Sequence, residues 1–164
     1  MSYLPDKTFE NVKAQVGSSV SAQTISNTFA AVEGTTITYT PAAGADYVVY
    51  EAQVQFNYGH YPSEGVAHKD FLHLRLQEEL IANTWTDIDS TRFNSYTLYY
   101  SYVPEKMRFI LPTTGWTGAR GLRLAGRAWV DNYSVELHKT KSWDSNGIQL
   151  LSYPHVTVYS ITEE

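Results

Sequence analysis

Cysteine is absent from this chain of 164 residues, so disulfides and thiolate metal sites are excluded, while the compartment is left open. Charged residues make up 18% of the sequence, below the usual value of about a quarter. The formal net charge of −5 offers no general attraction to nucleic acid. No run approaches the ~18 consecutive apolar residues of a membrane-spanning helix. The first 17 residues contain no apolar run of signal length, so we expect cytosolic synthesis and no membrane partner.

Catalytic signatures are also missing. The sequence has no GxSxG, HExxH or GxxxxGK[ST] motif. Glu78 and Glu79 are adjacent, so on a strand they point to opposite faces and cannot act as a paired acid and base. His60 and His68 share a loop region with Asp70, but a loop does not guarantee the converging geometry that a metal ion needs. We therefore predict no enzymatic activity, no metal and no cofactor.

The sequence is rich in tyrosine and in segments where apolar and polar side chains alternate. There are 13 tyrosines, and aromatic residues make up 14% of the chain; this composition favours pleated strands. The longest alternation covers residues 47–58, where apolar side chains share one face and Glu51, Gln53, Gln55 and Asn57 share the other. Further strands are predicted at residues 36–40, 71–80, 96–103, 107–111, 121–131, 135–137 and 154–161, with a polar loop between residues 80 and 96.

About eight strands and no convincing long helix predict an all-β fold, a jelly-roll-like antiparallel β-sandwich. The chain length fits one domain with a sizeable core. The shared phase of the strands predicts the core residues Val48, Tyr50, Val54, Phe56, Leu72, Leu74, Leu122, Leu124 and Val130.

The N-terminal stretch differs from the rest, and we divide the chain into residues 1–30, an arm or extension, and residues 31–164, the sandwich. Phe9, Val12 and Val16 have helical spacing behind Asp6, a potential N-cap, which predicts one or two turns of helix. So short a helix does not stand alone in water. It is either a packed extension or an arm that docks on a partner through Phe9, Val12 and Val16.

Outward strand positions carry amides, arginine and large rings rather than lysine and glutamate, and this composition favours an interface between subunits. The alternative is an ordinary solvated face. The predicted interface residues are Tyr47, Gln53, Gln55, Arg123, Arg127 and Trp129.

The segment TYTPAAGADYVVY (residues 38–50) resembles the strand, turn and long aromatic strand of C1q/TNF-like jelly rolls. The closing pattern is similar to the end of many tailed-phage virion proteins. It runs through GLRLAGRAW (121–129), VELHKT (135–140), Trp143-Asp144 and PHVTVYSI (154–161). The resemblance covers roughly residues 35–161 in pattern, and it carries over no catalytic residue.

The resemblance implies a homotrimer that acts as a capsid decoration protein, a head fibre or a tail knob. We expect a structural virion protein, made in the host cytoplasm, whose partners are its own copies and the major capsid protein or another virion protein. The alternative is a receptor-binding tail or head-fibre knob that recognises a host glycan or surface protein. That alternative predicts an exposed aromatic groove, for which Trp85, Trp116 and Trp143 are candidates because they fall in or near loops.

Overall fold

The computed structural model describes residues 7–17, 21–58, 70–97, 104–128, 135–141 and 149–163. Within these ranges every regular element is a β-strand, and all strand pairs are antiparallel. The predicted all-β fold class is therefore confirmed. No helix that could cross a membrane occurs in the described ranges.

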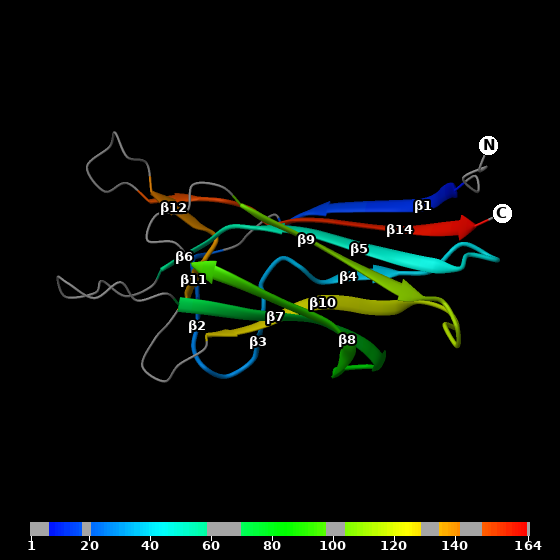
Figure 1. Cartoon of the computed structure of the whole chain (residues 1–164), viewed down its shortest axis with the longest axis horizontal. Helices are drawn as coiled ribbons and strands as arrows, with labels where there is room; N and C mark the ends of the chain where they lie inside the picture. Colours follow the sequence, from blue (N-terminus) through cyan, green and yellow to red (C-terminus); the bar gives the residue numbers. More distant parts are fainter. Residues whose placement is uncertain are drawn as a thin grey trace, which may run out of the picture.

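Two larger sheets build the molecule (Figure 1). The four-stranded sheet has the order β1 (Lys7–Val16), β14 (His155–Glu163), β5 (Tyr47–Val54), β9 (Glu105–Pro112). The five-stranded sheet has the order β3 (Ala30–Ala31), β10 (Arg120–Ala128), β7 (Asp70–Ile81), β8 (Thr84–Thr97), and β4 (Ile37–Tyr39) also pairs with β10.

Two smaller sheets complete the described structure. One contains β2 (Gln23–Ile25), β11 (Val135–Leu137) and β6 (Phe56–Tyr58), and the other pairs β12 (Lys139–Lys141) with β13 (Gln149–Leu151). Val135 and Leu137 of β11 are fully buried and extend the core towards these small sheets.

The chain alternates between the two larger sheets. The strands β1, β5, β9 and β14 belong to the first sheet, while β4, β7, β8 and β10 belong to the second. Among these eight strands, only β7 and β8 follow one another within the same sheet. Eight strands that cross between two facing sheets in this way form a jelly roll. The predicted jelly-roll-like sandwich agrees with this order.

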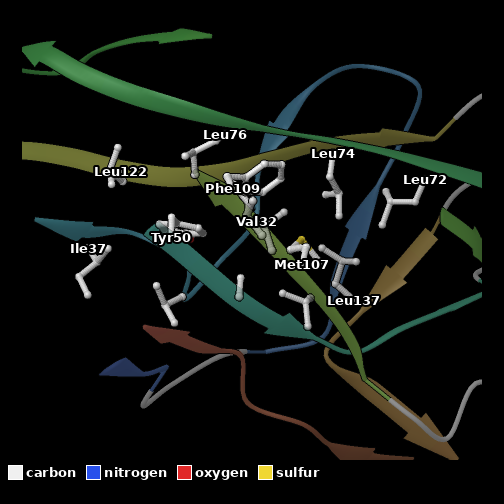
Figure 2. Close-up of a cluster of buried hydrophobic side chains, with 14 of the residues drawn as sticks. Val32, Ile37, Tyr50, Leu72, Leu74, Leu76, Met107, Phe109, Leu122 and Leu137 are labelled. Carbon is white, nitrogen blue, oxygen red and sulfur yellow. The ribbon is translucent and has the colours of Figure 1, made fainter. Parts of the chain in front are cut away.

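The core fills the space between the two sheets. Figure 2 shows Leu76 and Leu122 directed from one sheet towards Tyr50 and Met107 of the other. The inward alternation was predicted correctly for every core residue that the structure describes, and Val130 lies outside the described residues. The buried hydroxyl of Tyr50 donates to the carbonyl oxygen of Thr35 at 2.7 Å.

The predicted N-terminal helix is wrong. Residues Lys7–Val16 form strand β1, which pairs with β14 at the edge of the four-stranded sheet. The register slips by one residue between Glu10 and Lys13, and Asn11 in this bulge has a φ of 50°. Such a bulge adds one residue to the strand, so Phe9 and Val12 acquire a spacing of three that imitates a helix.

The division at residue 30 has no counterpart in the pairing of strands. Strand β1 belongs to the four-stranded sheet, β2 pairs with β11, and β3 pairs with β10. Ile25 is fully buried in the same core as residues of the later strands. The described part of residues 1–30 is thus packed as part of the sandwich.

The predicted polar loop between residues 80 and 96 is also wrong, because this segment is strand β8 and forms a hairpin with β7. Its residues are mainly threonine, aspartate and serine, so the alternation carries no hydrophobic signal. Four residues, 88–91, face the single residue Leu76. The hydroxyl of Thr91 accepts a hydrogen bond from the Leu76 amide at 3.0 Å and so supports the ladder across this bulge.

Gln55 corrects another expectation. The long predicted strand over residues 47–58 is interrupted there, between β5 and β6, and the Gln55 side chain is buried rather than outward. The Gln55 carbonyl accepts a hydrogen bond from the amide of His138 at 2.7 Å. Val54 and Phe56 on either side are buried as predicted, so the strand break at Gln55 buries this one side chain in addition to its neighbours.

The core packing yields a first prediction. Replacing Leu74, which is 2% exposed, with alanine removes buried methyl groups and should lower the free energy of unfolding by about 2–5 kcal/mol. The matched control is Leu80→Ala on the same strand, where the side chain is 58% exposed and the expected loss is below about 0.5 kcal/mol. Urea unfolding of both variants measures the difference. Equal losses would contradict the inward register of β7.

Candidate binding surfaces

The outer face of the four-stranded sheet carries an apolar surface at one end. Directly paired residues on neighbouring strands point to the same side of a sheet, which places Tyr159, Val49 and Ile110 in one outward row. The next row contains Phe9, Ile161, Tyr47 and Pro112. Val12 lies in the β1 bulge opposite Tyr159. We call this set of residues the apolar face: Phe9, Val12, Tyr47, Val49, Ile110, Pro112, Tyr159 and Ile161.

Part of the apolar face is open to solvent, while Val49 within it is 1% exposed. Phe9 is 60% exposed, Val12 is 64% exposed and Ile110 is 56% exposed. The ring of Phe9 contacts that of Tyr159 edge to face, with 5.5 Å between centroids. Single exposed hydrophobic residues are ordinary, but a contiguous apolar group marks an interaction surface.

The opposite end of the same sheet face is polar. Glu51 accepts hydrogen bonds from Nε of Arg108 at 2.5 Å and from the hydroxyl of Tyr159 at 3.1 Å. Burial, together with the nearby Glu51 carboxylate, raises the pKa of Tyr159. A hollow of about 400 Å³ lies here, lined by Glu51, Ala52, Gln53, Lys106, Met107, Arg108, His155 and Thr157.

One carboxylate lines this hollow. This carboxylate, Glu51, forms an ion pair with Arg108. The lining provides no second carboxylate with which Glu51 could form an acid–base pair. The hollow is lined mainly by polar and charged side chains.

The outer face of the five-stranded sheet has a different character. Arg123 and Arg127 of β10 point outward beside Gln77 and His73 of β7, and Arg75 pairs with Arg92 of β8. We call this surface the arginine face, and it comprises Arg75, Arg92, Arg123 and Arg127 with Phe29, Gln77, Glu79, Trp85 and Asp87.

Aromatic rings hold the guanidinium groups of the arginine face. The guanidinium carbon of Arg75 lies 3.4 Å from the ring centroid of Phe29, and that of Arg127 lies 5.2 Å from the same centroid. Arg123 stacks over Trp85 at 4.0 Å. Gly121 makes this stack possible, since a Cβ at its position would come within 3.0 Å of the Trp85 ring.

A chain of polar contacts also links the arginine face. Nε of Arg123 donates to the Gln77 side-chain oxygen at 2.9 Å, and the Gln77 amide donates to Asp87 at 2.9 Å. The other oxygen of Asp87 forms an ion pair with Arg75. Burial lowers the pKa of Arg123. These guanidinium groups are held in place before any ligand arrives.

The predicted interface residues are not brought together. Tyr47 and Gln53 lie on the outer face of the four-stranded sheet, while Arg123 and Arg127 lie on the outer face of the other sheet. Gln55 is buried, and Trp129 lies outside the described residues. Of the predicted arm residues, Phe9 and Val12 join the apolar face, and Val16 is 54% exposed at the other end of β1.

The tryptophan candidates form no open stack for a sugar in the described structure. Trp85 lies beneath Arg123, and Trp116 lies beneath Arg120 at 4.6 Å. The indole nitrogen of Trp116 donates to the Gly118 carbonyl at 3.1 Å. Trp143 lies outside the described residues. The sequence could not reveal the cation–π stacks, because Phe29, Trp85 and the arginines are far apart along the chain.

The histidine-based metal hypothesis cannot be placed on the structure. His60 and His68 lie outside the described residues, and only the backbone of Asp70 is described. Within the described ranges no three histidine, aspartate or glutamate side chains are grouped as a metal site.

Comparison with known proteins finds no matching protein-family model and no matching curated protein. Function has to be inferred from the two surfaces themselves.

One buried histidine gives a pH-dependent prediction. His138 is fully buried with a φ of 64°, and neither ring nitrogen has a hydrogen-bond partner. Burial lowers the pKa of His138 from 6.5 to about 4. Between these values the unfolded chain binds a proton that the folded protein excludes, so stability is full above pH 6.5 and falls towards pH 4. The loss of unfolding free energy between pH 6.5 and pH 4 that comes from His138 amounts to about 3 kcal/mol.

The variant His138→Asn tests it, because asparagine tolerates a positive φ and does not titrate. Urea unfolding from pH 7 to pH 4 should show a flatter profile for this variant than for the original protein. The matched control His155→Asn, at an exposed position, should keep the original slope. Parallel profiles for the original protein and His138→Asn would contradict the assignment.

Proposed function

We propose that this chain is a structural protein that assembles with copies of itself, as a homotrimer, through the apolar face. The exposure of Phe9, Val12 and Ile110 on one sheet face carries the proposal. Burying such side chains against other copies removes apolar area from water and stabilises the folded subunits. Around a three-fold axis each copy can meet its neighbour through unlike surfaces, so the charged end of the sheet can remain polar.

The particle role is the second part of the proposal. We assign the trimer to a phage virion, as a capsid decoration protein that binds the major capsid protein or another virion protein. The resemblance to C1q/TNF-like jelly rolls and to tailed-phage proteins supports this assignment. Among the described strands β1 is an edge of its sheet, and it carries the exposed Val16. This edge is the candidate contact with the particle, because an edge strand can pair with a strand of a partner.

A non-catalytic role fits the distribution of polar groups. The space between the sheets is filled by apolar side chains. The outward carboxylates Glu51 and Asp87, and Glu78 on the opposite face of β7 from Glu79, are engaged by arginines. The alternative role, a receptor-binding knob, is favoured by one observation, the arginine face.

Light scattering tests the assembly. At micromolar concentration the protein should have three times the 18.5 kDa mass of one chain. Ile110→Asp places a charge in the buried apolar face and should lower the mass towards that of the monomer, since an unpaired charge is costly to bury. The control Leu80→Asp changes a side chain that is similarly exposed, at 58%, on the other sheet. It should leave the mass unchanged.

A monomeric original protein would remove the proposal of self-assembly. A trimer that survives Ile110→Asp would show that a different surface forms the contact.

The virion assignment has a separate test. An antibody against this chain should label the surface of intact phage particles in electron micrographs. Val16→Asp should reduce its attachment to the particle without changing the trimer mass, whereas deletion of the N-terminal stretch is unsuitable because β1 is paired with β14. Absence of the chain from purified particles would contradict this part alone.

A further inference from the structure

The arginine face reverses the charge of the molecule locally. The whole chain has a net charge of −5, yet this face presents four arginines and two carboxylates, Glu79 and Asp87. Within the described parts of the chain, ion pairing engages Arg75 but not Arg92, Arg123 or Arg127. An unbalanced group of cations on an acidic protein attracts an anionic partner.

The guanidinium groups are oriented before binding. Arg123 is fixed by Trp85 on its face and by Gln77 at its Nε. Arg127 is packed near Phe29, and its Nε is buried without a hydrogen-bond partner. Side chains already held in place lose less conformational freedom when a ligand binds. The terminal nitrogens can then meet carboxylate or sulfate groups through two parallel hydrogen bonds.

The positions of these cations suit a polymer more than a single ion. Arg123 and Arg127 are four residues apart on β10, which corresponds to about 13 Å along a strand. Arg75 lies on the neighbouring strand, opposite Ala125 and therefore between them. Charges spread along a flat sheet can engage repeated anionic groups at once, and several weak contacts then act together.

We infer that the arginine face binds an acidic polysaccharide, a linear and hydroxyl-rich polyanion that carries carboxylate or sulfate groups. Gln77 and Asp87 lie between the arginines, where Gln77 binds Arg123 and Asp87 binds Arg75, so they keep the guanidinium groups spaced for repeated anionic groups. Single-stranded nucleic acid fits less well, because its bases need open aromatic rings, and Arg123 already covers Trp85. The arginine face and the apolar face lie on different sheets of the sandwich.

The experiment uses the full chain and four soluble probes: dextran sulfate, alginate, uncharged dextran and double-stranded DNA. Isothermal titration at about 50 mM salt should show binding to dextran sulfate or alginate and none to dextran, with a marked loss at about 500 mM salt. The double variant Arg123→Gln with Arg127→Gln should weaken binding by at least about tenfold, because two charge-assisted contacts are lost.

The matched control, Lys7→Gln with Lys13→Gln, also removes two positive charges, but from β1. It should change the affinity by less than about twofold. The double variant could lose binding because it misfolds, so Arg92→Gln, at an exposed position, serves as a second test. It should weaken binding with unchanged thermal stability. Light scattering on the same samples separates a loss of assembly from a loss of binding. Equal weakening by both double variants, no binding to either acidic polymer, or tighter binding to DNA would each overturn the inference.

Discussion

Both outer faces of this sandwich depend on one constraint, the two-residue alternation of side chains along strands whose inner positions are filled. Val48, Tyr50 and Ala52 belong to the core, so Tyr47, Val49 and Glu51 lie on the other face of β5, where Val49 is covered and 1% exposed. The same constraint on β10 sends Leu122 and Leu124 inward and Arg123 outward. A slip of one residue in either strand would expose leucine and valine and would bury arginine, which would be costly.

Two tyrosines tie the facing sheets together and fix this register. Tyr50 of the four-stranded sheet donates to the carbonyl of Thr35, and the Thr35 hydroxyl accepts a hydrogen bond from the Leu124 amide at 3.1 Å. From the opposite side, the hydroxyl of Tyr39 on β4 bonds to the Ser160 hydroxyl on β14 at 2.7 Å. These buried groups have their partners only when β4, β5, β10 and β14 are in the observed alignment, so they specify it.

The sequence was informative wherever the alternation was regular and apolar. The inward residues of β5, β7, β9 and β10 follow from their phase, and with them the all-β class. Prediction failed where one residue interrupted the period. The bulge at Asn11 made β1 resemble a helix, and the break at Gln55 reversed the expected direction of that side chain. The candidate surfaces were harder to predict, because contacts such as Arg75 with Phe29 join distant segments and leave no local pattern.

The central claim is that the two faces of one jelly roll meet different partners, copies of the chain on one side and an acidic polymer on the other. Hydroxyl-radical footprinting tests both faces in a single series of samples, by varying protein concentration with and without dextran sulfate. Labelling of Phe9 and Ile110 should fall as concentration rises, while labelling of Phe29 and Trp85 should fall only when dextran sulfate is added. The account is contradicted if Phe9 and Ile110 remain as reactive as the exposed reference residues Leu80 and Ile81 at every concentration.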